Sequence, residues 1–271
     1  MVGSYSNELR THLEAYKKRR LGVDASGRWR KKTYEHILPP SLRMLNILEP
    51  IRAEVSEYLA SRKSVQLHRD FAHLNSSQAM CFNLFFPLLA RWRTRLAPGM
   101  TGLPFDPSRV ADWQFEHIRD PTEGTNFDAY VRTKEGTEHL FEVKLSESEF
   151  GKAENDSHHR KKLDSIYQPR LRGKIDPAFL KPNRFFTHYQ LLRNIAYVEP
   201  DLGVGVTFIL PQANPRLRPA LERVLAALSP DVARFTRVIH LEELVERLRK
   251  VRHLHLASYF DCFGEKYTPF G

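Results

Sequence analysis

The sequence predicts an α/β fold in which a mixed β-sheet is flanked by helices. Three short strand patterns follow one another at 113–118, 127–132 and 139–145. A strongly apolar, β-branched run at 203–210 has the composition of a fully buried strand. Apolar residues at helical spacing occur before and between these strands. The resulting order, α-β-β-β-α-β followed by α-β-α elements, is typical of one α/β domain.

The N-terminal part of the chain is expected to be helical. Residues 7–20 form a weakly amphipathic stretch, and apolar residues recur at helical spacing between 42 and 59. Pro50 is expected to kink the second of these helices or split it in two. The next helix, from 77 to about 96, is apolar on nearly every side and is therefore expected to be buried. We divide the chain into a basic helical extension, 1–72, and a domain, 73–271.

The later elements follow the same logic. The strands at 127–132 and 139–145 are joined through Lys134-Glu135-Gly136, a short turn signal that predicts a β-hairpin. Residues 146–184 are polar and basic, and we expect only partial helix there. Helices are expected at 185–197, 217–228 and 241–251, with a short strand at 237–241. The segment from 253 onward is aromatic, and its pattern is ambiguous.

The charge of the chain is unevenly distributed. The 271 residues carry a formal net charge of +10, yet residues 100–149 hold 11 acidic and 5 basic side chains. The flanking segments are basic, with 14 basic and 8 acidic residues in 1–72 and 10 basic and 4 acidic in 150–194. Such a contrast is compatible with ordinary solvated surface. It also favours a carboxylate cluster that binds a cation, within a basic surface that binds a polyanion.

Composition excludes several classes of protein. Only two cysteines are present, so a disulfide scaffold and a cysteine-rich zinc site are excluded. No apolar run reaches the length of a membrane span, and no signal-peptide pattern is visible, so we expect a cytoplasmic protein with no membrane partner. No serine-hydrolase elbow, Walker loop or dinucleotide-binding glycine motif occurs.

The chemistry is expected around Asp128, Glu142 and Lys144. Glu142 and Lys144 are two apart on a predicted strand and therefore project to the same face, while Phe141, Val143 and Leu145 face a core. Asp128 lies on the partner strand of the hairpin, so strand pairing can bring it to Glu142. Mg²⁺ is typically bound by one or two carboxylates together with waters and substrate phosphate. A lysine beside them can orient a water or stabilise charge on a phosphate in the transition state.

These residues and their order resemble the PD-(D/E)xK nuclease superfamily, the restriction-endonuclease-like fold, over residues 75–210. Asp128 matches the first acid of its motif, with Phe127 in place of the usual proline, and Glu142 and Lys144 match the (D/E)xK pair. The resemblance also implies Glu116 as an additional upstream acid that binds metal and Gln190 as a helix glutamine facing the site. Glu-Phe-Gly at 149–151 is similar to a bacterial restriction-endonuclease-like group. The resemblance thus implies a Mg²⁺-dependent deoxyribonuclease, with Mn²⁺ as a substitute.

Each assignment has a structural alternative. The three motif residues are also compatible with the polar face of an amphipathic strand, and Gln190 with an ordinary polar position on a helix. Glu123 competes with Glu116 for the upstream position. Asn75-Ser76-Ser77-Gln78 is first of all a signal for a helix N-cap; as the alternative, Gln78 and Asn83, inside an otherwise apolar helix, are expected to hydrogen-bond towards the site.

The function itself also has alternatives. They are a non-catalytic nucleic-acid-binding protein on the same fold and a metal-dependent hydrolase of small phosphorylated substrates. For the nuclease, the expected partner is DNA, most simply double-stranded, and cutting two strands favours a homodimer. Basic segments at 17–20, 28–32, 160–162 and 170–174 are expected to contact phosphates, and Trp29, Tyr34 and Tyr167 are candidates for stacking on bases.

Overall fold

The computed structural model describes residues 4–93, 96 and 99–270. Its centre is a five-stranded mixed sheet with the spatial order β3-β4-β5-β6-β7. The strands are β3 (Val110–Ile118), β4 (Asn126–Thr133), β5 (Glu138–Val143), β6 (Val204–Leu210) and β7 (Thr236–His240). The first three are antiparallel neighbours, whereas β6 runs parallel to both β5 and β7. The predicted hairpin and the mixed sheet are both confirmed.

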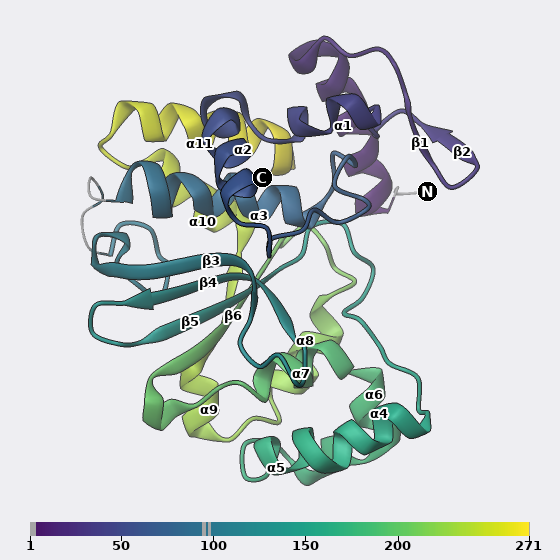
Figure 1. Ribbon diagram of the computed structural model, residues 1–271, viewed down its shortest axis with the longest axis vertical. Helices are drawn as coiled ribbons and strands as arrows, with labels where there is room; N and C mark the ends of the chain where they lie inside the picture. The colour runs from purple at the N-terminus through teal and green to yellow at the C-terminus, as the bar shows by residue number, and fades with distance from the viewer. Residues whose placement is uncertain (1–3, 94–95, 97–98, 271) are drawn as a thin grey trace.

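Helices cover both faces of this sheet (Figure 1). The layer drawn above it contains α1 (Tyr5–Leu21), α2 (Glu49–Ser61), α3 (Ser77–Phe86), α10 (Leu241–Arg249) and α11 (Leu254–Tyr267). The layer below it contains α4 (Ser157–Lys162), α5 (Gln168–Leu171), α6 (Pro182–Thr187), α7 (Tyr189–Ile195), α8 (Arg218–Leu225) and α9 (Pro230–Phe235). The predicted α/β class, with a mixed sheet flanked by helices, is confirmed.

The sheet separates two hydrophobic cores. Along β5, Phe141 and Val143 lie in the core beneath the upper helices, as does Leu145 just beyond the strand. Leu140 lies in the other core, together with Phe208 of β6. Successive side chains of a strand point to opposite faces, so this alternation follows directly from the sequence. It also fixes the face on which Glu142 projects, which is that of Leu140.

The N-terminal segment is only partly helical. Between α1 and α2 it contains a small hairpin, β1 (Gly27–Trp29) and β2 (Lys32–Tyr34), which the sequence pattern did not predict. Leu9 and Leu13 of α1 pack in the same core as Phe141. Residues of 1–72 therefore share a core with the sheet, and the division of the chain at residue 72 stays a prediction.

Prolines explain how the next elements are divided. A 3-10 helix, Pro40–Asn46, is separate from α2, where Pro50 occupies the first turn. Proline lacks a backbone N–H and its fixed φ suits a first helical turn, so Pro50 begins a helix instead of kinking one. The predicted split is confirmed. Further along, α3 ends at Phe86 and continues as a π-helical turn, Pro87–Arg91. The sequence predicts that this helix ends near residue 96. Residues 94 and 95, just before that end, lie outside the described part of the chain.

Two other segments differ from the sequence pattern. The helix expected at 185–197 is two helices, α6 and α7, because His188 between them leaves helical geometry with φ −113° and ψ 26°. The ambiguous C-terminal segment forms α11, which buries Tyr259, Phe260 and Phe263. No helix in the described part of the chain is both long enough and apolar enough to cross a membrane.

Candidate active site

Asp128 and Glu142 are brought together by the β4–β5 hairpin. The last paired residues at this end of the hairpin are Ala129 and Phe141, so the two acids come next along their strands. The backbone N–H of Val143 donates a hydrogen bond of 2.6 Å to Asp128 Oδ2. This bond ties the carboxylate of one strand to the backbone of the other. Asp128 Oδ1 has no hydrogen-bond partner among the described residues, and the residue is partly exposed.

Lys144 lies directly against Glu142. Its Nζ is 2.9 Å from Glu142 Oε1, and the two side chains are only 12% and 4% exposed. The backbone N–H of Lys144 donates to the carbonyl of Ile209, 2.8 Å away, which holds the residue beside β6 beyond the end of β5. The expectation that Glu142 and Lys144 share one face is confirmed.

The charges of the site act strongly on one another. Burial raises the pKa of Asp128 well above its usual range, and the charge of Glu142 adds to this effect. Burial by itself would lower the pKa of Lys144, but Glu142, Glu147 and Asp128 together raise it above its ordinary value. Lys144 is thus held charged. Two carboxylates beside one ammonium group leave an excess of negative charge in a weakly solvated place.

Helix α7 supplies two amides that hold Glu142. Gln190 Nε2 donates to Oε1 at 2.7 Å, and Asn194 Nδ2 donates to Oε2 at 2.9 Å. Gln190 also accepts from the backbone N–H of Gly151 at 2.9 Å, so it anchors the loop that follows Lys144. The structure therefore brings the predicted Gln190 into the site. Asn194 was missed, although its i+4 spacing from Gln190 places both on one helix face.

Glu116 is held beside the site by three partners. Gln78 Nε2 donates to its Oε1 at 2.8 Å, Asn126 donates to Oε2, and His68 Nε2 lies 3.4 Å from Oε2. Its charge also raises the pKa of Asp128. Glu116 adopts φ 51°, which is unusual for a residue other than glycine and is the kind of strain found at functional sites.

The competing acid Glu123 has a different environment. Its carboxylate accepts hydrogen bonds from the hydroxyls of Tyr167 and Tyr197 and from the backbone N–H of Thr125. These contacts make it a buried structural group of the lower layer. Of the two acids, Glu116 is the one whose charge raises the pKa of Asp128, and its role as the upstream acid stays a prediction.

Polar residues of the buried helix α3 have divergent roles. Gln78 bonds to Glu116, as one of the two expectations for it required. Asn83 instead bonds to the carbonyl of Asn46 and to Tyr267, and it accepts from the N–H of Leu48. The expectation that Asn83 reaches towards the site is wrong; it holds the upper helices together.

A metal site would need several ligand side chains close enough together to hold one ion. Among the residues that the structure describes, no three His, Cys, Asp or Glu side chains are grouped so that they could hold one metal ion. The core of the site is therefore a pair of carboxylates with a lysine, and Glu116 stands beside it. The assignment of metal ligands stays a prediction.

Fold and site together define a class. The mixed sheet flanked by helices is consistent with a restriction-endonuclease-like fold, and two acids and a lysine lie at the end of its β4–β5 hairpin. A family model described as "Restriction Endonuclease associating with ARP" matches residues 10–268. The chain therefore belongs to this family. Comparison with curated proteins and comparison with solved structures each gave no match.

Proposed function

We propose that this protein is a Mg²⁺-dependent deoxyribonuclease of the PD-(D/E)xK type that hydrolyses phosphodiester bonds in DNA. The observation that carries the proposal is the buried Glu142–Lys144 ion pair beside Asp128, whose pKa is raised. Membership of a restriction-endonuclease family supports DNA as the substrate. The description of that family also supports association with a partner called ARP.

The donor set fits a hard divalent cation. Asp128 offers a free Oδ1, and Glu142 Oε2 accepts a single hydrogen bond, although a carboxylate oxygen carries two lone pairs. Burial raises the pKa of Asp128, and the charge of Glu142 raises it further, so a cation between the two carboxylates would be favourable. Mg²⁺, or Mn²⁺ in its place, would supply that charge and would also neutralise a scissile phosphate. Asp128 and Glu142 would hold it.

The chain's own residues divide the remaining tasks. Lys144, held charged at 2.9 Å from Glu142, is placed to orient the attacking water or to stabilise negative charge that develops on the phosphate. Gln190 and Asn194 fix both oxygens of Glu142 and so keep that carboxylate in one orientation. Glu116 adds negative charge close to Asp128. Cutting both strands of a duplex would take two such sites, which favours a homodimer.

The experiment that tests this proposal is cleavage of supercoiled plasmid with Mg²⁺ or Mn²⁺. Lys144→Ala and Glu142→Gln are compared with the parent, because each removes one charge of the proposed centre. We expect cutting by the parent and at least a hundredfold loss in both variants, on the scale reported for groups that stabilise transition-state charge.

The matched control is Lys250→Ala. Lys250 also forms a lysine–glutamate ion pair, 2.7 Å from Glu246, but its side chain is 73% exposed. This variant should cut like the parent. If the parent binds DNA in a salt-sensitive manner yet cuts no DNA with either metal, the non-catalytic binding protein replaces the nuclease as the better explanation.

A further inference from the structure

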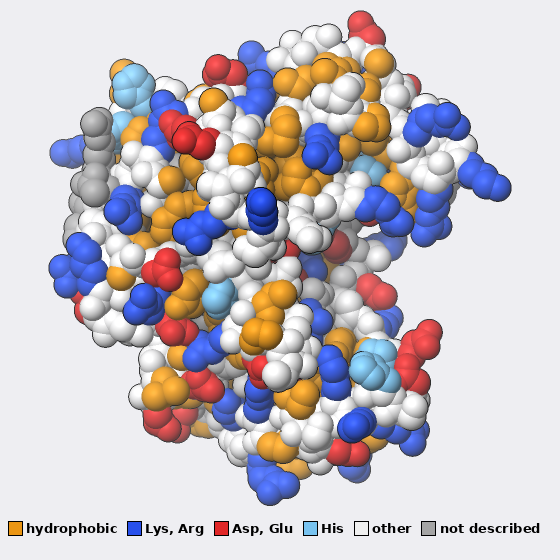
Figure 2. Space-filling model, viewed as in Figure 1, with side chains coloured by type: hydrophobic (Ala, Val, Ile, Leu, Met, Phe, Trp, Pro, Cys, Tyr) orange, Lys and Arg blue, Asp and Glu red, His pale blue; other side chains and the backbone are white. Residues whose placement is uncertain are grey.

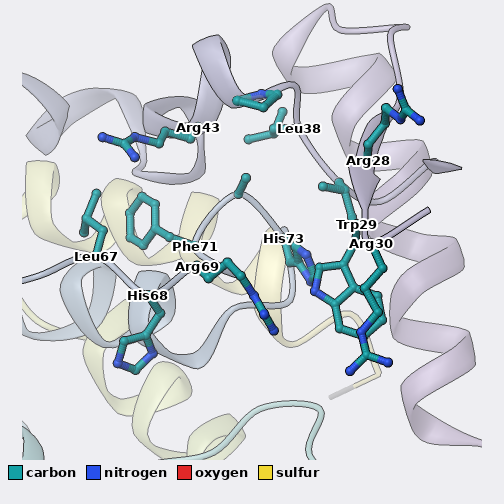
Figure 3. A pocket seen from close by; sticks show the side chains of 13 residues that line it. Arg28, Trp29, Arg30, Leu38, Arg43, Leu67, His68, Arg69, Phe71 and His73 are labelled. Atoms are coloured by element: carbon teal, nitrogen blue, oxygen red, sulfur yellow. The ribbon is translucent and has the colours of Figure 1, made fainter. Parts of the chain in front are cut away.

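A basic cavity lies in the N-terminal segment, outside the site described above. Its volume is about 490 Å³. Four arginines contribute to its lining, from three separate segments of the chain, and they are Arg28, Arg30, Arg43 and Arg69. Figure 3 shows these side chains around it, with Trp29 and Phe71 among them. Among the residues that the structure describes, no aspartate or glutamate lines this cavity.

The arginines are available to a ligand. Arg28, Arg30, Arg43 and Arg69 are all exposed. Within the described ranges of the chain, Arg28, Arg30 and Arg43 form no ion pair with a carboxylate, and Arg69 has only a contact of 3.4 Å with Asp70. Unbalanced guanidinium groups of this kind favour a polyanionic ligand.

The β1–β2 hairpin carries a sign of functional strain. Its turn consists of Arg30 and Lys31, between the paired residues Trp29 and Lys32, and Arg30 adopts φ 55°. Two-residue hairpin turns favour glycine at positions of positive φ, because other residues are strained there. Arg30 therefore adopts a conformation that glycine would adopt with less strain.

Trp29 is held in a defined orientation beside this turn. Its Nε1 donates to Asp70 Oδ1 at 2.8 Å, and the Arg30 guanidinium lies 4.3 Å from the centre of its ring. An aromatic ring that is fixed at its edge and flanked by arginines is the arrangement that proteins use to stack nucleobases next to phosphates.

The cavity continues towards the proposed active site. His68 and Arg69 also line a second cavity of about 480 Å³, whose other wall includes Ser146 and Glu147, shortly after Lys144 in the chain. His68 contacts Glu116, and that hydrogen bond raises the pKa of His68. The two cavities share His68, Arg69 and His73, so they form a path from the hairpin towards the acids of the site, and Asp70 and Glu147 also lie along it.

The space-filling view agrees with this path. Figure 2 shows Lys and Arg side chains gathered over the β1–β2 hairpin at the upper right, and the molecule hollowed below them, between the two helical layers. Arg28, Lys31 and Lys32 are exposed basic residues of this hairpin. A long polyanion that reached the acids from this side would pass the hairpin.

We propose that the cavity of the β1–β2 hairpin binds the DNA strand next to the scissile phosphate, with Arg28, Arg30, Arg43 and Arg69 on backbone phosphates and Trp29 against a base. This inference rests on the proposed function, because the nuclease site supplies the reason for DNA at this place. It adds a substrate-binding element that the motif residues do not include. An acidic protein segment is the competing occupant, and the test separates the two.

The test measures binding of a fluorescently labelled DNA duplex over a range of salt concentrations, in EDTA so that no cutting occurs. The key variant is Arg30→Gly with Arg43→Ala. Because glycine relieves the strain at residue 30, this protein should fold at least as well as one with Arg43→Ala alone. We expect weaker DNA binding and a slope of log K against log salt that is less steep by about 2, one for each lost phosphate contact.

Two further variants complete the design. Arg234→Ala removes an exposed arginine of α9, paired with Asp231 at 3.0 Å, and should leave both affinity and slope unchanged. Trp29→Phe should abolish quenching of tryptophan fluorescence by single-stranded DNA, if Trp29 is the residue that contacts a base. Parental affinity and parental slope in the Arg30→Gly, Arg43→Ala protein would overturn the inference and would leave an acidic protein segment as the occupant.

Failure of the nuclease proposal would look different. If the protein cuts no DNA but its DNA binding depends on Arg30 and Arg43 as expected, the proposed binding element stands and only the catalytic assignment is rejected. If the protein cuts DNA but neither cutting nor binding changes when these arginines are replaced, the nuclease proposal stands and the proposed binding element is rejected.

Discussion

Replacing Lys144 by methionine should destabilise the metal-free protein substantially. Methionine has nearly the volume of lysine but no charge, so Glu142 loses its ion-pair partner while the packing is largely preserved. Lys144 is also the group whose charge lowers the pKa of Asp128, against the effects of burial, Glu142 and Glu116. The variant would leave these carboxylates with no compensating cation between them.

The magnitude follows from the geometry of the pair. At 2.9 Å, two unit charges attract each other by about 6 kcal/mol at an effective dielectric constant of about 20. Desolvation of the two ions offsets part of this attraction. Removing one partner of a buried ion pair commonly costs about 3–5 kcal/mol. In a protein of this size, that corresponds to a fall in melting temperature of about 6–20 °C.

The assay is thermal unfolding at pH 8 in EDTA, where proton uptake by the carboxylates is less favourable than at lower pH. Lys144→Met is measured alone, with Glu142→Gln alone and with both changes together. The double variant should lose less stability than the sum of the single variants, since it removes both members of the pair. Lys250→Met, which breaks an exposed pair, should cost less than about 1 kcal/mol. A Lys144→Met protein that melts within 2 °C of the parent, or strict additivity in the double variant, would refute this account of the site.

Three further predictions concern the same centre. Burial and neighbouring charges raise the pKa of Asp128 in the folded protein. Protonated Asp128 therefore contributes stability that is fully present below about pH 4 and is lost as the pH rises through the folded pKa. Asp128→Asn should flatten this part of the plot of melting temperature against pH. Mg²⁺ at about a hundred times its dissociation constant should stabilise the parent by about 2.7 kcal/mol, and calorimetry should show no such gain in Asp128→Asn. Asn194→Ala leaves Glu142 Oε2 without its hydrogen-bond donor. We expect plasmid cutting to fall about 10- to 100-fold and the free energy of unfolding to fall by about 1–3 kcal/mol. Unchanged cutting would show that Asn194 is not part of the site.

The central motif could be predicted because its geometry is local. Glu142 and Lys144 share a face through the two-residue period of a strand, and Asp128 joins them through a hairpin whose turn is visible in the sequence. Gln190 was expected on the resemblance to known nucleases, and Asn194 lies one helical turn further along.

The surroundings of Glu116 could not be predicted in the same way. Its partners His68, Gln78 and Asn126 come from a loop, a buried helix and the start of a strand, and nothing in their spacing marks them as neighbours. The expectation for Gln78 was correct and that for Asn83 was wrong, although both are amides in one apolar helix. Which side of the helix faces which neighbour is decided by packing, which a single apolar pattern leaves open.

The sequence by itself determined the order of the strands in the central mixed sheet and the acidic pair with its lysine, because hydrophobic periodicity and turn residues act over a few neighbouring positions. Only the tertiary structure decided that Glu116 rather than Glu123 stands beside Asp128, that α7 holds Glu142 with two amides, and that the arginines of the β1–β2 hairpin meet Arg43 and Arg69 around one cavity. These contacts join segments far apart in the chain. The free energy that stabilises them comes from burying side chains and pairing charges when the layers of the fold pack together.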